Sequence, residues 1–350
     1  MLRSLYSGIS GMKVNQTKLD VIGNNIANVG TTAFKSARVR FEDMLSQNVS
    51  QALSAGVNQG GINPRQVGLG VQLAGIDTMV TQGMMQPTSR NLDAAIDGDG
   101  YFVVGIGPVP QTNTAGVTLD ANNFSSITGT NGMNISYTRD GSFTLDSQGN
   151  LLTSDGYRVM GYAVSTGTAG DPNSVDYTNG VPSVNFVDAN KPYSVDKNAP
   201  TLVPLVIPDS VVTDPGDPVN GVPATSLRIQ SFSIGKDGQI SAVLEDGSVS
   251  VLGQIAMASF KNPAGLTKLG KNLYSESANS GDATIRTGIG SAKDNSKGYG
   301  DMLQGMLEMS NVDLAEQFTD MIVSSRAFQA NTKTITTGDE ILQDILSLKR

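Results

Sequence analysis

Apolar residues recur at every seventh position at both ends of this 350-residue chain. Near the C-terminus the series consists of Leu307, Leu314, Met321, Phe328, Ile335 and Leu342. Near the N-terminus it consists of Leu5, Met12, Leu19 and Ile26, with Leu2 and Ile9 at the second position of the heptad. A seven-residue apolar repeat on a helix forms a narrow stripe that requires a partner helix. We therefore expect both ends to be subunit-interface helices that pair with each other and with neighbouring chains.

The two stripes predict one helix over residues 3–28 and a second over residues 311–349, about 39 Å and about 58 Å long. The first contains Gly8, Gly11 and Gly23, each costing roughly 0.5–1 kcal/mol relative to alanine. Such a helix is marginal alone and should become ordered on packing. The alternative is a core helix of a monomer. The second helix is too long for one side of an ordinary compact domain, which favours an assembly.

The C-terminal helix has a recognisable beginning and end. Ser310 is the expected N-cap, with Asp313 three residues later as a variant of the capping box. Asp313 and Glu316 suit the positive end of the helix dipole, and Lys349 and Arg350 suit the negative end.

The composition excludes several classes of site. The chain has no Cys, no His and no Trp, and its formal net charge is -8. Without Cys and His there can be no disulfide, no zinc site of the usual kind and no Ser-His-Asp nucleophile. The acidic balance offers no basic surface for a nucleic acid. We expect no catalytic residue, no cofactor and no metal site.

The N-terminus lacks the features of a general secretory signal. Residues 1–16 carry a charge at Arg3 but no continuous apolar core of about seven residues or more. No window of the sequence approaches about eighteen apolar residues, so membrane insertion is not expected. Leaving the cytoplasm would require another export route.

The middle of the chain predicts antiparallel β structure. Segments 92–96 and 101–104 resemble strands, and Asp-Gly pairs lie between them at 97–98 and 99–100. Further Asp-Gly pairs begin at Asp140, Asp155, Asp237 and Asp246. Such pairs are typical of hairpin turns, and we expect a hairpin at each.

The expected fold class is α+β, with discontinuous domains and one β module inserted in another. The expected division is a terminal helical coiled-coil domain over 1–30 and 305–350, an extended connecting arm over 31–70, a β domain over 71–164 and 228–304, and an inserted outer β module over 165–227. The inserted module holds nine of the chain's 14 prolines, and proline interrupts central strands.

The loop over residues 93–100 has a composition that resembles a metal-binding loop. Asp93, Asp97 and Asp99, with Gly98 and Gly100, faintly resemble a calcium loop. The bidentate Glu expected at the end of such a loop is missing, and its flanks resemble strands rather than helices. A plain turn is the favoured interpretation.

Both ends of the chain carry motifs that resemble one known family. The N-terminal motif comprises Asn24, Asn25, Ile26, Ala27, Asn28, Thr31, Phe34 and Lys35, and resembles the signature of the flagellar rod and hook proteins. The C-terminal motif comprises Ser310, Asn311, Val312, Asp313, Arg326, Gln329, Ala330, Asn331 and Thr337. Ala33 stands where the family usually has Gly, so the backbone is expected to differ slightly there.

Within that family, segments 253–256 and 262–266 and the inserted module resemble the hook branch most closely. The resemblance implies a structural, non-enzymatic subunit that polymerises into a flexible tube transmitting torque from rod to filament. The alternative within the family is the distal rod. A secreted hydrolase or adhesin using the β domains is the rival from another class.

The resemblance also implies a set of partners and a location. The partners are copies of the chain itself in a helical homopolymer, the distal rod protein, the hook-filament junction protein, the hook cap during assembly and the flagellar type III export apparatus. Segment 41–45 weakly resembles an export-gate motif. The implied location is the hook and basal body of the bacterial flagellum, extracellular after export.

Overall fold

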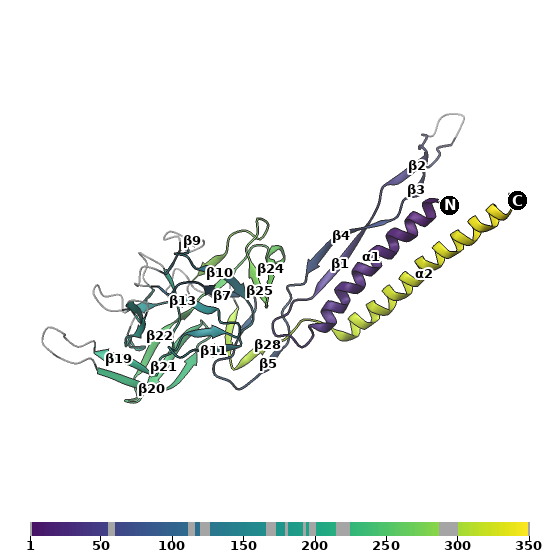
Figure 1. Ribbon diagram of the computed structural model, residues 1–350. Coiled ribbons are helices and arrows are strands. Elements are labelled where there is room, and N and C mark those ends of the chain that lie inside the picture. Colours follow the sequence, from purple (N-terminus) through teal and green to yellow (C-terminus); the bar gives the residue numbers. More distant parts are fainter. Residues whose placement is uncertain are drawn as a thin grey trace. The chain divides into compact units, whose positions relative to one another are not determined.

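The computed structural model describes residues 2–54, 60–110, 116–119, 127–165, 173–178, 181–191, 194–195, 201–214, 225–286 and 300–348 (Figure 1). The chain divides into two compact units. Unit 1 comprises Met1–Thr81 and Ser310–Arg350, and unit 2 comprises Gln82–Met309. A helix lies at each end of the chain and antiparallel strands fill the middle, which confirms the α+β, multidomain fold class.

Unit 1 contains both helices, α1 (Leu2–Ala27) and α2 (Leu314–Ser347). It also contains strands β1 (Ala37–Asp43), β2 (Ser46–Ser50), β3 (Arg65–Gly68) and β4 (Val71–Thr78). Strand β1 pairs antiparallel with β4, and β2 pairs with β3. These four strands form a long two-stranded ribbon, and its β1–β4 part lies beside α1 (Figure 1).

This ribbon corrects the expected connecting arm over 31–70 and the expected start of the β domain at 71. The described residues of the arm include the paired strands β1, β2 and β3, and β4 belongs to the same ribbon because it pairs with β1. A two-stranded ribbon is marginal alone, but here a helix supports it. The Gly70 backbone lies against Ser7 and Ser10 of α1, and the Val71 amide donates to Ser10 Oγ at 3.4 Å.

The start of α2 differs from the expected position. The helix begins at Leu314 rather than within 305–311, and Leu307 lies in strand β28 (Met306–Glu308). Asp313 is the N-cap, and its Oδ1 accepts from the amides of Ala315 at 2.8 Å and Glu316 at 3.4 Å. A carboxylate both caps the free amides and matches the dipole. Ser310 instead accepts from the Val312 amide at 3.4 Å. Lys349 and Arg350 lie outside the described residues.

In unit 2 the described residues form strands and one 3-10 turn, η1 (Pro263–Gly265). The remaining strands are β5 (Met85–Pro87), β6 (Ala94–Asp97), β7 (Tyr101–Ile106), β8 (Val117–Leu119), β9 (Ile127–Gly129), β10 (Asn134–Thr138), β11 (Phe143–Leu145), β12 (Leu151–Thr153), β13 (Arg158–Tyr162), β14 (Val164–Ser165), β15 (Val175–Thr178), β16 (Val181–Val184), β17 (Ser194–Val195), β18 (Thr201–Pro204), β19 (Ser210–Asp214), β20 (Thr225–Ile234), β21 (Gln239–Leu244), β22 (Val249–Ile255), β23 (Met257–Ser259), β24 (Thr267–Gly270), β25 (Leu273–Ser275), β26 (Thr284–Arg286) and β27 (Asp301–Gln304).

The main sheet of unit 2 runs in the order β19-β20-β21-β22-β13-β7-β10-β25-β24, and the pairs along it are antiparallel. Strand β7 lies between two hydrophobic cores. Phe102 and Val104 belong to one core, and Tyr101 and Val103 to the other. Since successive side chains of a strand point to opposite faces, β7 is covered on both sides.

Several of the expected hairpin turns are confirmed. Turns with left-handed Gly156, Gly238 and Gly247 join β12 to β13, β20 to β21 and β21 to β22. The expected hairpin at Asp140 is wrong, because β10 pairs with β7 and β25 while β11 pairs with β12. The expected hairpin at 97–100 is wrong, because β6 pairs with β27 while β7 pairs with β10, β13 and β23. The carbonyls of that turn bind the Arg139 guanidinium instead.

The segment 165–227 does not form a unit of its own in its described residues. Strand β18 pairs with β13 and β8, and Val175 and Tyr177 belong to the same core as Phe102. The prolines are accommodated because Pro204 ends β18 and Pro182 lies in the two-stranded β15–β16 pair. Pro172, Pro192, Pro200, Pro215, Pro218 and Pro223 lie outside the described residues.

The turn at Asp146 gives a pH-dependent prediction. Burial acts to raise the pKa of Asp146, but hydrogen bonds from Asn150 and Gln148 and the charge of Arg158 outweigh it, so the pKa is lowered. The carboxylate therefore stabilises unit 2 above its unfolded pKa, and this contribution is lost as the pH falls through the lowered folded value. Asp146→Asn should cost about 1 kcal/mol at pH 7 and flatten the acid side of the stability profile. Denaturant titrations between pH 2 and 7 measure both, and an equally steep profile would contradict the assignment.

Candidate assembly site

The two terminal helices pack antiparallel in unit 1, with the start of α1 beside the end of α2 (Figure 1). Glycines set their separation. A Cβ built on Gly8 would lie 3.2 Å from Ile335 Cγ1, and one on Gly11 would lie 2.6 Å from Asn331 Nδ2. On α2, a Cβ at Gly338 would lie 2.9 Å from Leu5 Cδ2. These three glycines therefore permit close approach of the helices, which offsets their cost in helix propensity.

The face of α2 toward α1 follows a regular heptad pattern with two kinds of position. The apolar positions are Met321, Phe328, Ile335 and Leu342, all half-buried. The intervening positions are small or polar: Gln317, Ser324, Asn331 and Gly338. Sequence reasoning missed this second series because its members are not apolar. The sequence signal for this second series is its position, because each member lies four residues before or three residues after an apolar position of the heptad.

The predicted interface residues of α1 differ in how far their side chains are buried. Leu5, Met12, Leu19 and Ile26 are half-buried, whereas Ile9 is 38% exposed. Thr332 of α2 donates to the Met12 sulfur at 3.4 Å. The side chain of Leu2 lies outside the described residues. A role for these residues in contacts between subunits stays a prediction.

Two apolar patches on α2 remain exposed. The first comprises Leu314, Phe318 and Ile322, which are 40%, 50% and 63% exposed. The second comprises Ile341, Ile345 and Leu348, which are 47%, 48% and 85% exposed. Because residues three and four apart share one side of a helix, each set forms a continuous strip. We call them the first and second α2 patches.

Asn25, from the N-terminal motif, joins three elements of unit 1. It is 2% exposed. Its Nδ2 donates to the Ala37 carbonyl at 2.9 Å and to Gln317 Oε1 at 3.0 Å, and its Oδ1 accepts from the Ala37 amide at 3.0 Å. The amide thereby satisfies the backbone of β1 as a neighbouring strand would, and fixes α1 to β1 and α2.

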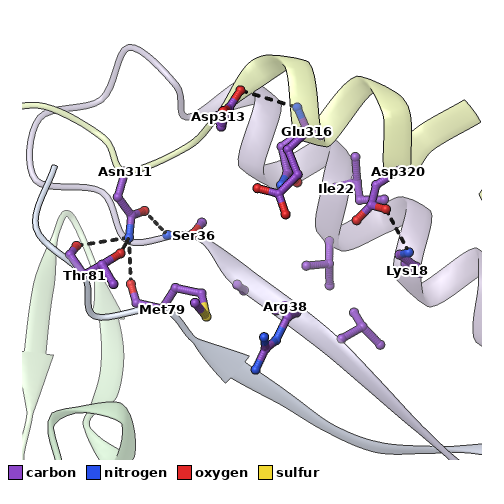
Figure 2. A pocket seen from close by; sticks show the side chains of 14 residues that line it. Lys18, Ile22, Ser36, Arg38, Met79, Thr81, Asn311, Asp313, Glu316 and Asp320 are labelled. Carbon is purple, nitrogen blue, oxygen red and sulfur yellow. Dashed lines mark hydrogen bonds and ion pairs between the residues drawn. The ribbon is translucent and has the colours of Figure 1, made fainter. Parts of the chain in front are cut away.

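Asn311, from the C-terminal motif, performs a similar function before α2 begins (Figure 2). Its Oδ1 accepts from the Ser36 amide at 2.8 Å, and its Nδ2 donates to the Met79 carbonyl at 2.8 Å and to Thr81 Oγ1 at 3.0 Å. Buried Lys35 donates from Nζ to the Thr81 carbonyl at 2.8 Å. The two terminal motifs thus meet at one junction in the fold.

The rest of the N-terminal motif shapes the end of α1. Asn28 Nδ2 donates to the Asn24 carbonyl at 2.9 Å and to Asn24 Oδ1 at 2.7 Å, and Thr31 Oγ1 donates to Asn28 Oδ1 at 3.1 Å. Ala33 has a φ of 54°, in the left-handed region that glycine adopts most readily. Ala27 ends α1, and the Phe34 carbonyl accepts from the Asn311 amide at 3.4 Å.

A cleft of ≈ 240 Å³ adjoins this junction, between α1, α2 and β1 (Figure 2). Its lining includes Lys18, Arg38, Asp313, Glu316 and Asp320, and Lys18 Nζ lies 3.4 Å from Asp320 Oδ1. Within the described ranges, no three His, Cys, Asp or Glu side chains gather as a metal site, and no helix could span a membrane.

Three family profiles match the chain. "Flagella basal body rod protein" matches residues 5–35, "Flagellar hook protein FlgE/F/G D1 domain" matches 118–242, and "Flagellar basal body rod FlgEFG protein C-terminal" matches 303–348. The first and last cover most of α1 and all of α2.

Individual relatives span the full chain. The flagellar basal-body rod protein FlgG of Bacillus subtilis is 41% identical over 350 residues, covering 100% of both chains. The flagellar hook protein FlgE of Borreliella burgdorferi is 31% identical over 473 aligned positions, also covering 100% of both. Among solved structures, hook protein FlgE2 of Helicobacter pylori matches 64% of this chain and 100% of its own, with 12% identity and a TM-score of 0.39.

Proposed function

Because this chain belongs to the family of flagellar hook and basal-body rod proteins, we propose that it is a structural subunit of the distal rod. In this proposal, copies of the chain stack into a straight axial tube through the terminal helices. The family consists of structural proteins of the flagellum, so the role is mechanical rather than catalytic.

The full-length match to a rod protein carries the choice of rod over hook. The alignment to the Bacillus subtilis rod protein needs only 350 positions at 41% identity. The alignment to the Borreliella burgdorferi hook protein needs 473 positions, so that protein has long segments with no counterpart here. The described residues of 165–227 also give the hook no separate support, because β18 pairs with β13 of the large sheet and Val175 and Tyr177 belong to the same core as Phe102.

The α2 patches support assembly from copies of the same chain. Contiguous exposed apolar surface on a soluble protein commonly marks a contact with another molecule. The antiparallel helix pair already uses Met321, Phe328 and Ile335 for packing within the chain. We therefore place contacts between subunits on the first and second α2 patches rather than on the whole predicted heptad series.

The hook remains the second candidate, because the hook protein of Borreliella burgdorferi also covers the entire chain, at 31% identity. The two candidates imply different neighbours. A distal rod subunit would contact rod and hook proteins. A hook subunit would also contact the hook cap and the hook-filament junction protein. Export through the flagellar type III apparatus is part of both.

Immunogold labelling of purified hook–basal bodies separates the two candidates. Antibodies against unit 2 are expected to decorate the straight rod segment below the hook. Particles along the curved hook would overturn the rod proposal and support the hook. Labelling of the same particles with pre-immune serum is the control for non-specific label.

A further inference from the structure

One ion pair in unit 2 is far more buried than the others. Arg139 Nε lies 2.7 Å from Glu308 Oε2, and the two side chains are 2% and 0% exposed. In the described part of the chain, every other ion pair has a partner at least 43% exposed. Taking two charges out of water is costly, so the position of this pair requires an explanation.

The backbone carbonyls of the turn over residues 96–100 surround the guanidinium group of Arg139. Its Nη2 donates to the carbonyls of Ile96 at 3.0 Å and Gly98 at 2.7 Å, and its Nη1 donates to the Gly100 carbonyl at 3.2 Å. This is the loop that resembles a calcium site in the sequence. The loop surrounds a cation, but this cation is the Arg139 side chain, and the loop binds it through backbone carbonyls rather than through its own aspartates.

Glu308 ties together the two ends of unit 2. Its Oε1 accepts from the Gly83 amide at 2.9 Å, while Oε2 binds Arg139. Unit 2 begins at Gln82 and ends at Met309, so Gly83 and Glu308 lie where the chain enters and leaves. Beside them, Met85 pairs with Glu308 in the β5–β28 ladder, and the Met309 amide donates to the Met84 carbonyl at 2.9 Å.

The β5–β28 ladder alone would resist separation poorly. Its register joins Met306, Leu307 and Glu308 to Pro87, Gln86 and Met85, and such a short two-stranded pair is weak. A force that pulls the entering and leaving segments apart would break its hydrogen bonds one after another, starting at Glu308. Charge-assisted bonds are roughly twice as strong as neutral ones, and here they lie at that starting point.

We propose that Arg139 and Glu308 form a clamp that holds the entering and leaving strands of unit 2 together under mechanical load. The guanidinium connects the clamp to the 96–100 turn and β7, so a force on either strand reaches the sheet. This inference concerns unit 2 alone and holds for a rod or a hook subunit.

Pulling the full chain between positions 82 and 309 tests the clamp directly. The sequence has no Cys, so Gln82→Cys and Met309→Cys provide unique attachment points for optical tweezers. In this background, Glu308→Gln should raise the rate of strand separation at a given force about tenfold or more. Asp301→Asn is the control, because it removes the exposed Lys236–Asp301 contact at 3.9 Å in neighbouring β27. It should leave the rate unchanged.

Hydrogen exchange in the chain without handles gives a second measurement. Glu308→Gln should accelerate exchange of peptides containing β5 and β28 about tenfold, while peptides from β21 and β22 keep their wild-type rates. An unchanged separation rate would overturn the clamp, as would equal acceleration in all four strands, because the pair would then only stabilise unit 2 as a whole. If Glu308→Gln does not fold, Glu308→Asp keeps the charge and shortens its reach, with the same expected outcomes.

Discussion

Replacing Phe318 and Ile322 together by aspartate is expected to abolish polymerisation while leaving the monomer folded. Both side chains are at least half exposed on α2, and exposed substitutions usually change stability by no more than about 0.5 kcal/mol each. In a polymer that covers the first α2 patch, the two carboxylates would become buried without partners. Each would cost several kcal/mol, which corresponds to more than a ~100-fold rise in the concentration needed to assemble.

Sedimentation and negative-stain electron microscopy of the purified chain measure this effect, with circular dichroism to establish the helical content. The control adds two aspartates at Gln329 and Thr336, which are exposed polar positions of the same helix outside both α2 patches. It should assemble near the wild-type concentration. Wild-type polymers from the Phe318 and Ile322 double variant would show that the first patch faces away from neighbouring subunits.

Gly141→Ala is expected to cause the largest loss of stability from a single methyl group. A Cβ there would lie 1.6 Å from the Ala94 carbonyl oxygen and 2.7 Å from its carbon. The strand cannot withdraw without breaking the bond from the Ala94 amide to the Gly141 carbonyl, at 3.1 Å. The turn also follows Arg139, so movement would disturb the clamp. We expect a loss of about 3 kcal/mol or more.

Urea denaturation followed by the near-ultraviolet signal of the buried tyrosines of unit 2 measures this loss. The same substitution at Gly23 provides the contrast. No atom lies within 4 Å of the position of its Cβ, and alanine favours a helix by roughly 0.5–1 kcal/mol. The helical ellipticity of the Gly23→Ala variant should therefore be larger in magnitude than that of the wild type. A Gly141→Ala variant as stable as the wild type would mean that β6 can move freely from this turn.

The structural features that could be predicted from sequence are those that depend on a local pattern of side chains. The heptad series at Met321, Phe328, Ile335 and Leu342 predicts α2, and Asp-Gly turns predict the β20–β21–β22 hairpins. In both cases the residues that determine the structure are neighbours in sequence. Glycine has no side chain to contribute to a periodic pattern, so the sequence indicates only that Gly8 and Gly11 lower the helix propensity of α1. The close packing of α2 against these two positions explains why they are glycine.

The remainder depends on partners distant in sequence. Strand β6 pairs with β27 and β5 pairs with β28, but no local pattern near Ala94 indicates a strand after residue 300. The buried Arg139–Glu308 pair joins residues 169 positions apart. The N-cap at Asp313 could have been found from sequence, since Asp is among the favoured capping residues. The preference for Ser310 arose from the capping-box spacing.

The bond between Asn25 and Gln317 joins positions 292 residues apart, and this has a consequence for the order of events in synthesis. When α1 leaves the ribosome, the helix against which Gly8 and Gly11 pack does not yet exist. A glycine-containing helix without a partner is unstable in water, and closing so long a loop is slow. The helix pair is therefore expected to form only after α2 has been translated, so α1 lacks its packing partner while the residues of unit 2 are being synthesised.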